Sequence, residues 1–113
     1  MSQYLSVDHY KHASQTHPDD SWARVTAVTD DLNQLGRKLD AVRFTDEAFA
    51  QEQVTKLSEL QQSGKTLPLQ AVPLAHKELY GRTFKDGSGW PNEGGSKTYE
   101  GHTASCTATV INK

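Results

Sequence analysis

The chain has 113 residues, of which 23% are charged and 35% hydrophobic, and its formal net charge is −2. This length predicts one domain over 1–113, and the absence of a basic excess argues against nucleic acid as the main partner. The single cysteine, Cys106, excludes an intramolecular disulfide. Since no apolar run reaches the length of a signal peptide or a membrane span, we expect a cytoplasmic protein with no membrane contact.

The N-terminal segment, 1–17, carries three histidines, for which we expect one or two helical turns. His9, His12 and His17 lie within nine residues, and neutral imidazole is a common metal ligand. A structural zinc site requires four ligands, usually with thiolates, and the spacing here fits no such site. We therefore expect no metal and no cofactor. A small metal-binding or enzymatic domain that uses these histidines is the alternative.

The strongest pattern lies in the first half of the segment 18–64. Apolar residues recur there at steps of 3, 4, 3, 4 and 3 residues, at Val25, Val28, Leu32, Leu35, Leu39 and Val42. This spacing predicts one long helix, from Pro18 to Phe44, with a seam that packs against another helix. Trp22 extends the same stripe. Gly36 costs about 1 kcal/mol relative to alanine, so it is either tolerated or marks the close approach of a partner's backbone.

A second helix is predicted between Thr45, a plausible N-cap, and Gly64, a good residue for a helix C-terminus. Its apolar stripe is less regular than that of the first helix. Because almost no loop separates the two, they should form an antiparallel helical hairpin. The alternative is a single long helix that kinks near residues 44–45.

The connector, 65–81, contains Pro68 and Pro73. The residues that precede each proline should avoid the helical region, so we expect an extended segment over 66–72. Pro73 can occupy the first turn of a short third helix that ends at Gly81.

The last segment, 82–113, changes character. Residues 82–90 are typical of a strand, a turn at Asp86–Gly87 and a returning strand, with Gly87 and Gly89 at positions of positive φ. Polar and small residues alternate over 104–111, which favours a further strand. The predicted fold is therefore α+β: the helical hairpin, the short third helix and a small C-terminal antiparallel β-sheet.

No constellation in the sequence predicts catalysis. Cys106 and His102 would lie about 13 Å apart on a strand, beyond hydrogen-bond reach. His76 and Glu78 are two apart, so they do not face each other on a helix. The glycine-rich segment matches no phosphate-binding pattern. We expect no catalytic residue and no enzyme.

Trp90 lies between Gly89 and Pro91, in a segment that holds most of the glycines. The first interpretation is that its ring packs on the turns of its own domain. The second is a protein-binding surface, because tryptophan, tyrosine and arginine are enriched at interfaces; its residues would be Trp90, Tyr99, Arg82 and Phe84. A small ligand such as a sugar is the third.

These patterns favour a non-enzymatic protein interaction or assembly protein that acts through the helical seam and the aromatic glycine-rich loop. Small virus-encoded or mobile-element-encoded inhibitors and structural components share its gross features, which is an analogy between classes. The second helix has the weaker stripe, so part of the seam should remain uncovered. We therefore expect the partner to be a protein, first of all another copy of the chain in a homo-oligomer. A weak nucleic-acid-binding module is a further alternative.

Overall fold

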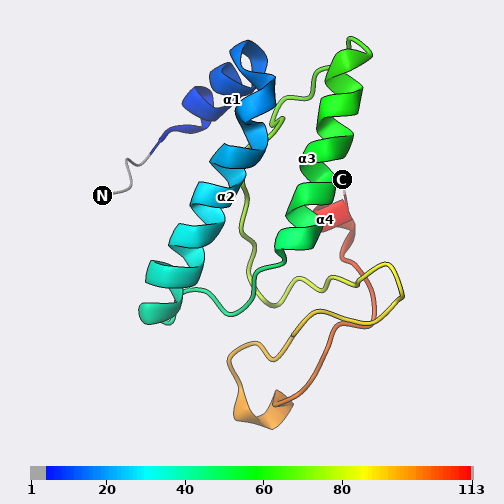
Figure 1. Ribbon diagram of the computed structural model, residues 1–113. Helices are drawn as coiled ribbons and strands as arrows, with labels where there is room; N and C mark the ends of the chain where they lie inside the picture. The colour runs from blue at the N-terminus through cyan, green and yellow to red at the C-terminus, as the bar shows by residue number, and fades with distance from the viewer. Residues whose placement is uncertain (1–4, 113) are drawn as a thin grey trace. The chain divides into compact units, whose positions relative to one another are not determined.

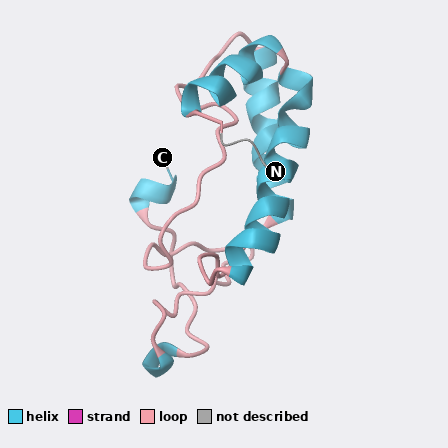
Figure 2. Ribbon diagram, turned by 90° about the vertical axis from the view of Figure 1, so that its left-hand side faces the viewer, coloured by secondary structure: helices cyan, strands magenta, loops and turns pink. Residues whose placement is uncertain are grey.

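The computed structural model describes residues 5–112, and all its regular elements are helices (Figure 1; Figure 2). The chain divides into two compact units, Met1–Leu74 and Ala75–Lys113. Residues 1–4 of the predicted N-terminal segment and residue 113 of the last segment lie outside the described range. The elements in chain order are α1 (Val7–Thr16), the 3₁₀ turn η1 (Pro18–Asp20), α2 (Ser21–Asp31), the π-helical turn η2 (Leu32–Gly36), α3 (Glu47–Gln62), the 3₁₀ turn η3 (Lys97–Tyr99) and α4 (Thr109–Asn112).

Helix α1 opens the first unit and is longer than the one or two turns predicted. Its N-cap is Ser6, whose hydroxyl accepts a hydrogen bond from the backbone N–H of His9 at 3.2 Å. An N-cap serine satisfies one of the amide groups that the first turn leaves without a partner. The helix then runs for ten residues, up to Thr16.

The predicted long helix is present but not uniform. It begins with η1 and α2, and then widens at η2, where the backbone N–H of Arg37 reaches the carbonyl of Leu32 five residues earlier. It ends before Phe44, in a Schellman motif. There the N–H of Ala41 bonds to the carbonyl of Gly36 at 2.8 Å, and Asp40 has a φ of 53°. This is the position where glycine is usually found, because a left-handed φ is costly for other residues.

Helix α3 confirms the predicted C-terminus and corrects the predicted N-cap. The cap is Asp46, whose carboxylate accepts the N–H of Phe49 at 2.9 Å. Thr45 instead donates to the Oδ1 of Asn33 at 2.8 Å, which ties the start of α3 to η2. At the other end, Gly64 adopts a φ of 81° in a second Schellman motif. Helices α2 and α3 lie side by side and antiparallel, so the hairpin is confirmed, although residues 41–46 form a longer connection than expected (Figure 1).

A polar network joins α1, α3 and the connector inside the first unit. The Ser14 hydroxyl donates to the carbonyl of Gln70 at 2.9 Å, and the Gln61 amide donates to the carbonyl of Ser14 at 3.1 Å. The Gln70 side chain closes the network by donating to the Oε1 of Gln61 at 2.8 Å and to the carbonyl of Leu57 at 3.4 Å. Ser14 is 2% exposed and Gln70 8%. Burying such groups is tolerated only because each of them finds partners.

The connector folds into turns where the sequence predicted an extended segment. Gln70 and Val72 each donate a backbone hydrogen bond to a residue three positions earlier, at 3.2 and 3.1 Å. Ala71 between them is buried and has a φ of 53°. Between the two prolines, the buried Gln70 side chain and its hydrogen bonds hold the chain in these turns.

The second unit lacks the predicted third helix. Around residues 77–80 there is one turn, closed by a bond from the N–H of Tyr80 to the carbonyl of Lys77 at 3.0 Å. Eight residues are too few to stabilise a helix without packing support. The side chain of Glu78 instead accepts the backbone N–H of Glu93 at 2.9 Å.

The predicted β-sheet is wrong: residues 5–112 contain no strand. In place of the sheet, this range contains two isolated antiparallel bridges, Thr83 with Gly89 and Pro91 with Thr103. Each bridge is a single pair flanked by backbone hydrogen bonds, for example from the N–H of Asn92 to the carbonyl of His102 at 3.0 Å. The N–H of Thr83 points away from Gly89 and bonds to the Thr107 side chain at 3.0 Å, so it pairs with no further strand. The alternation over 104–111 does not mark a strand either, since its end forms α4.

Replacement of the buried glutamine tests the polar network. Gln70→Ala should lower the free energy of unfolding by about 1 to 3 kcal/mol, because it leaves groups of Gln61 and Leu67 without partners. The matched control is Gln51→Ala on the exposed face of α3, which should stay within about 0.5 kcal/mol of the wild type. Urea denaturation of the two variants decides; equal stabilities would contradict the network's structural role.

The C-terminus of the first long helix offers a stabilising substitution. Asp40→Gly should raise the free energy of unfolding by about 1 kcal/mol, because it removes both a left-handed aspartate and a negative charge at the negative end of a helix. Asp40→Asn removes the charge alone and should give a smaller gain. The same denaturation measurement applies, and a loss of stability in Asp40→Gly would refute the helix end described here.

Candidate functional site

The predicted self-association seam divides into an inner and an outer part. Val25 is 8% exposed, whereas Leu35 is 51% exposed and Leu39 66%. Between these extremes, the half-buried members of the seam are Val28, Leu32 and Val42. The six side chains therefore do not form one continuous face, and the two outer leucines carry most of the apolar surface that the seam presents.

The division follows from the π-helical turn η2. The buried side chains of α2 are Ser21, Val25 and Thr29, which are spaced by four. A π turn advances each residue by less than the 100° of an α-helix. The residues after Leu32 are therefore displaced from that stripe, and Leu35 and Leu39 lie on the outer face. The heptad spacing alone could not reveal this change of winding.

Gly36 serves the chain itself and leaves no room for a partner's backbone. A Cβ atom built on Gly36 would lie 2.5 Å from a methyl carbon of Val42. The side chain of Val42 therefore occupies the space that the missing side chain leaves. The predicted approach of a partner's backbone is not what the structure shows, because the group that approaches Gly36 is the Val42 side chain of the same chain.

An aromatic cluster surrounds Trp90 in the second unit. The guanidinium carbon of Arg82 lies 5.2 Å from the centroid of the Trp90 ring, within the range of a cation–π contact. The Phe84 ring is 6.0 Å away and tilted, and the His76 ring is 6.2 Å away and nearly parallel. We call these four residues the Trp90 cluster. The sequence predicted that Arg82, Phe84 and Trp90 lie together. It missed His76, which was expected on a short helix and not against the Trp90 ring.

Tyr99 does not join this cluster. Its ring lies 6.0 Å from that of His102, and the side chain is 58% exposed. The Trp90 ring, by contrast, is half-buried among side chains of its own unit. This geometry matches the first interpretation of Trp90, in which the ring packs on neighbouring turns.

Close backbone contacts hold the segment around Trp90. Its carbonyl accepts the N–H of Ala104 at 3.0 Å, and its own N–H donates to the carbonyl of Arg82 at 2.8 Å. A Cβ atom on Gly89 would collide with the backbone of Ala104. Gly89 is therefore required for this close approach, but the positive φ predicted for it is wrong. Gly87 does have the predicted positive φ, of 85°.

The turn predicted at Asp86–Gly87 is confirmed. The Asp86 carboxylate accepts hydrogen bonds from the hydroxyl of Ser88 at 2.5 Å and from its backbone N–H at 2.9 Å. Both bonds favour the charged form, and they hold the pKa of Asp86 below its usual range.

The three N-terminal histidines do not assemble into a metal site. The His17 ring nitrogen lies 2.9 Å from the hydroxyl of Thr16, and the His9 ring contacts that of Tyr10. Within residues 5–112, no three His, Cys, Asp or Glu side chains are grouped closely enough to hold a metal ion. Cys106 is exposed, and the His102 ring nitrogen lies 2.9 Å from the carbonyl of Asn92.

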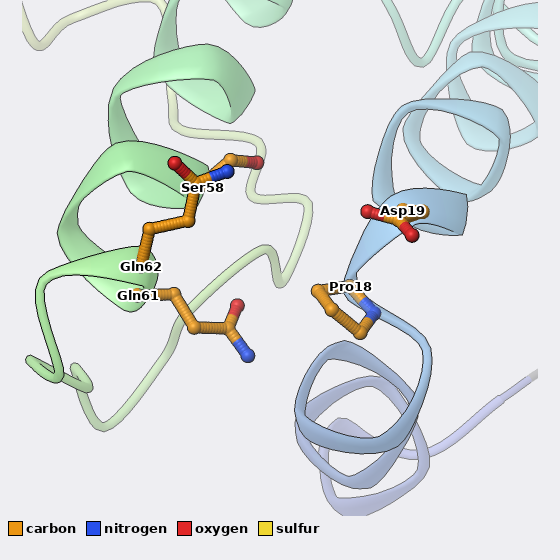
Figure 3. A pocket seen from close by; sticks show the side chains of 5 residues that line it. All are labelled: Pro18, Asp19, Ser58, Gln61 and Gln62. Carbon is orange, nitrogen blue, oxygen red and sulfur yellow. The ribbon is translucent and has the colours of Figure 1, made fainter.

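A small hollow lies between η1 and the end of α3 in the first unit (Figure 3). Its volume is about 130 Å³, and its lining residues are Pro18, Asp19, Ser58, Gln61 and Gln62. Ligand sites usually enclose about 300 to 1,000 Å³ and are mostly apolar. This hollow is therefore too small for an organic ligand of that kind.

No helix in the described range has the length and apolar character needed to cross a membrane. Comparison of the chain with protein-family models, with curated proteins and with solved structures found no match. The geometry of the side chains is thus the basis on which a function can be proposed.

The close contact at Gly89 gives a direct test of the Trp90 cluster. Gly89→Ala should disrupt the second unit, because the new methyl group meets the Ala104 backbone rather than a movable side chain. Gly87→Ala is the control: nothing lies within 4 Å of its Cβ, so it should cost only about 1 kcal/mol of backbone strain. In ¹H–¹⁵N spectra, Gly89→Ala should shift or broaden the amides of residues 81–104. Unchanged amides there would contradict the packing.

Proposed function

We propose that this chain is a non-enzymatic protein–protein interaction protein whose main contact surface is the outer face of the α2–η2 helix. The observation that carries the proposal is the exposure of Leu35 and Leu39, at 51% and 66%. The two leucines are one turn apart, since the N–H of Leu39 bonds to the carbonyl of Leu35 at 3.0 Å. They thus form a short continuous apolar strip, here called the Leu35–Leu39 face.

The composition of the interior supports the same proposal. The buried apolar residues of the range 5–112 are two valines and two alanines, and the largest fully buried side chain is that of Ser14. These small residues remove little apolar area from water, and apolar burial is the main favourable term in folding. Several larger apolar side chains, among them Leu35 and Leu39, are exposed at the surface. A partner that covers the Leu35–Leu39 face would supply apolar contacts that the interior lacks.

The Trp90 cluster is the second surface in this proposal. The Phe84 side chain is 39% exposed. The Tyr99 side chain lies outside the cluster and is 58% exposed. Because the Trp90 ring already contacts Arg82, Phe84 and His76, we give this surface the smaller role. We place the protein in the cytoplasm, where its exposed Cys106 would remain reduced. The analogy with small inhibitors and assembly components stays a prediction.

A photo-crosslinking amino acid at position 39 tests the main surface. In cells that express the full chain, a group at Leu39 should give a discrete covalent adduct with a protein, because a partner covers this position. The control is the same group at Glu59, an exposed position on α3. Adding Leu35→Asp to the position-39 variant should remove the adduct, because a buried unpaired carboxylate opposes the contact.

The amount of adduct is measured on a gel, and its mass identifies the attached protein. An adduct at position 39 that exceeds the one at Glu59 supports an interaction surface, whichever protein is attached. Equal labelling at both positions would contradict the proposal, because the Leu35–Leu39 face would then be no more occupied than an ordinary solvated one.

A further inference from the structure

We infer that the Asp86–Gly87 peptide bond is a site of spontaneous conversion of aspartate to isoaspartate, and that Ser88 suppresses this conversion in the folded chain. The inference concerns the turn beside the Trp90 cluster and does not depend on the contact surface proposed above. It rests on the adjacency of Asp86 and Gly87 in the sequence and on the hydrogen bonds that hold them in the structure.

The two residues supply all the reacting groups. The backbone nitrogen of Gly87 forms a bond to the Cγ atom of Asp86, and the hydroxyl of the protonated carboxyl group leaves as water together with the proton of that nitrogen. The product is a succinimide ring. Water then adds to either ring carbonyl, and the bond from that carbon to the nitrogen breaks. Opening at the main-chain carbonyl of Asp86 leaves the chain running through Cγ, which is isoaspartate, whereas opening at Cγ restores aspartate.

The sequence and the exposure of the turn favour this reaction at one place. Residues 86 and 87 are the only Asp–Gly pair of the chain, which has no Asn–Gly pair. Glycine has no Cβ atom that would hinder the approach of its nitrogen to the carboxyl group. Both residues are exposed, and a Cβ atom built on Gly87 would have no atom within 4 Å. The turn is therefore open to water and has room for the ring to close.

The folded turn opposes ring closure through Ser88. The Oδ1 atom of Asp86 accepts the Ser88 hydroxyl at 2.5 Å and the Ser88 backbone N–H at 2.9 Å. Both bonds stabilise the carboxylate and hold the pKa of Asp86 below its usual range. The carboxylate has no hydroxyl that can leave as water, so a lower pKa leaves less of the reactive, protonated form at neutral pH. The Gly87 N–H is also held, because it donates to the carbonyl of Phe84 at 3.1 Å.

Isoaspartate at position 86 would change the turn that holds Phe84 beside Trp90. The turn is closed by the bond from the Gly87 N–H and by a second bond, from the N–H of Phe84 to the carbonyl of Ser88 at 2.7 Å. Isomerisation inserts one more carbon–carbon bond, about 1.5 Å, into the main chain between these residues. The two hydrogen bonds cannot both keep their geometry, so the Phe84 ring, 6.0 Å from that of Trp90, should move in the modified chain.

The experiment follows isoaspartate formation in the full chain during storage at neutral pH. Isoaspartate and aspartate have the same mass, so the peptide that contains residue 86 is separated by chromatography and identified by electron-transfer fragmentation. Ser88→Ala should raise the rate about three- to tenfold, the factor expected for the loss of one exposed hydrogen bond. Ser88→Thr keeps the hydroxyl and should stay near the wild-type rate. The matched control is Ser105→Ala, an exposed serine of the same unit, which should have no effect.

The same chains in concentrated urea separate the effect of the turn from that of the local sequence. There all of them should react at similar rates, faster than the folded wild type. Absence of isoaspartate at position 86 in urea would show that this bond is not a site. A folded Ser88→Ala chain that reacts no faster than the wild type, or a folded Ser88→Thr chain as reactive as Ser88→Ala, would overturn the role of the hydroxyl. A general shift of the ¹H–¹⁵N amide signals over residues 81–104 in Ser88→Ala would also overturn it, because the faster reaction would then follow from unfolding of the unit.

Discussion

The hydrogen-bond network among Ser14, Gln61 and Gln70 constrains most of the first unit. It connects α1, α3 and the connector at one point, where two of its three side chains are almost fully buried. A buried polar network is stable only when every member keeps its partner, so it permits few alternative arrangements of the three segments. The left-handed Ala71 beside it is one consequence, because the chain must turn sharply to place Gln70 inside.

The polar interior has a consequence for the surface. Since Gln70 and Ala71 occupy the inner side of the connector, the neighbouring Leu67 and Leu69 are about half exposed. The π-helical turn has a similar effect on α2–η2, where it displaces Leu35 and Leu39 from the buried stripe. In both places leucine side chains remain in contact with water, whereas few apolar side chains of the described range are buried. Exposed apolar strips of this kind are typical of surfaces that meet another protein.

Local signals in the sequence predicted much of this structure. Heptad spacing predicted a helix in the first half of the hairpin, Gly64 predicted the end of α3, and Asp86–Gly87 predicted a turn. Each of these signals depends on residues close together in the chain. The β-sheet was wrong for a physical reason. Alternation over 104–111 predicts a strand only if a neighbouring strand can pair with it. The backbone N–H of Thr83 bonds to the Thr107 side chain instead of to a carbonyl of this segment, and the segment ends in α4.

The candidate surface was predictable only in part. The seam residues were identified, but which of them face water depends on a π-helical turn that no spacing rule contains. The network at Gln70 was missed because nothing local distinguishes a buried glutamine from an exposed one. The sequence grouped Arg82, Phe84 and Trp90 with Tyr99 as a partner-binding surface, but the Tyr99 ring lies apart, against His102. It missed His76, whose contact with the Trp90 ring joins residues fourteen positions apart.

The central proposal is that a protein partner, first of all another copy of the chain, covers the Leu35–Leu39 face, which is exposed in the single chain. The most direct measurement is the urea midpoint of unfolding at protein concentrations from about 1 to about 100 µM, because binding to the folded state raises stability by mass action. The account predicts a midpoint that rises steadily with concentration in the wild type and rises less in Leu39→Asp. A wild-type midpoint that stays constant over this range would contradict it, since folding would then be complete within a single chain.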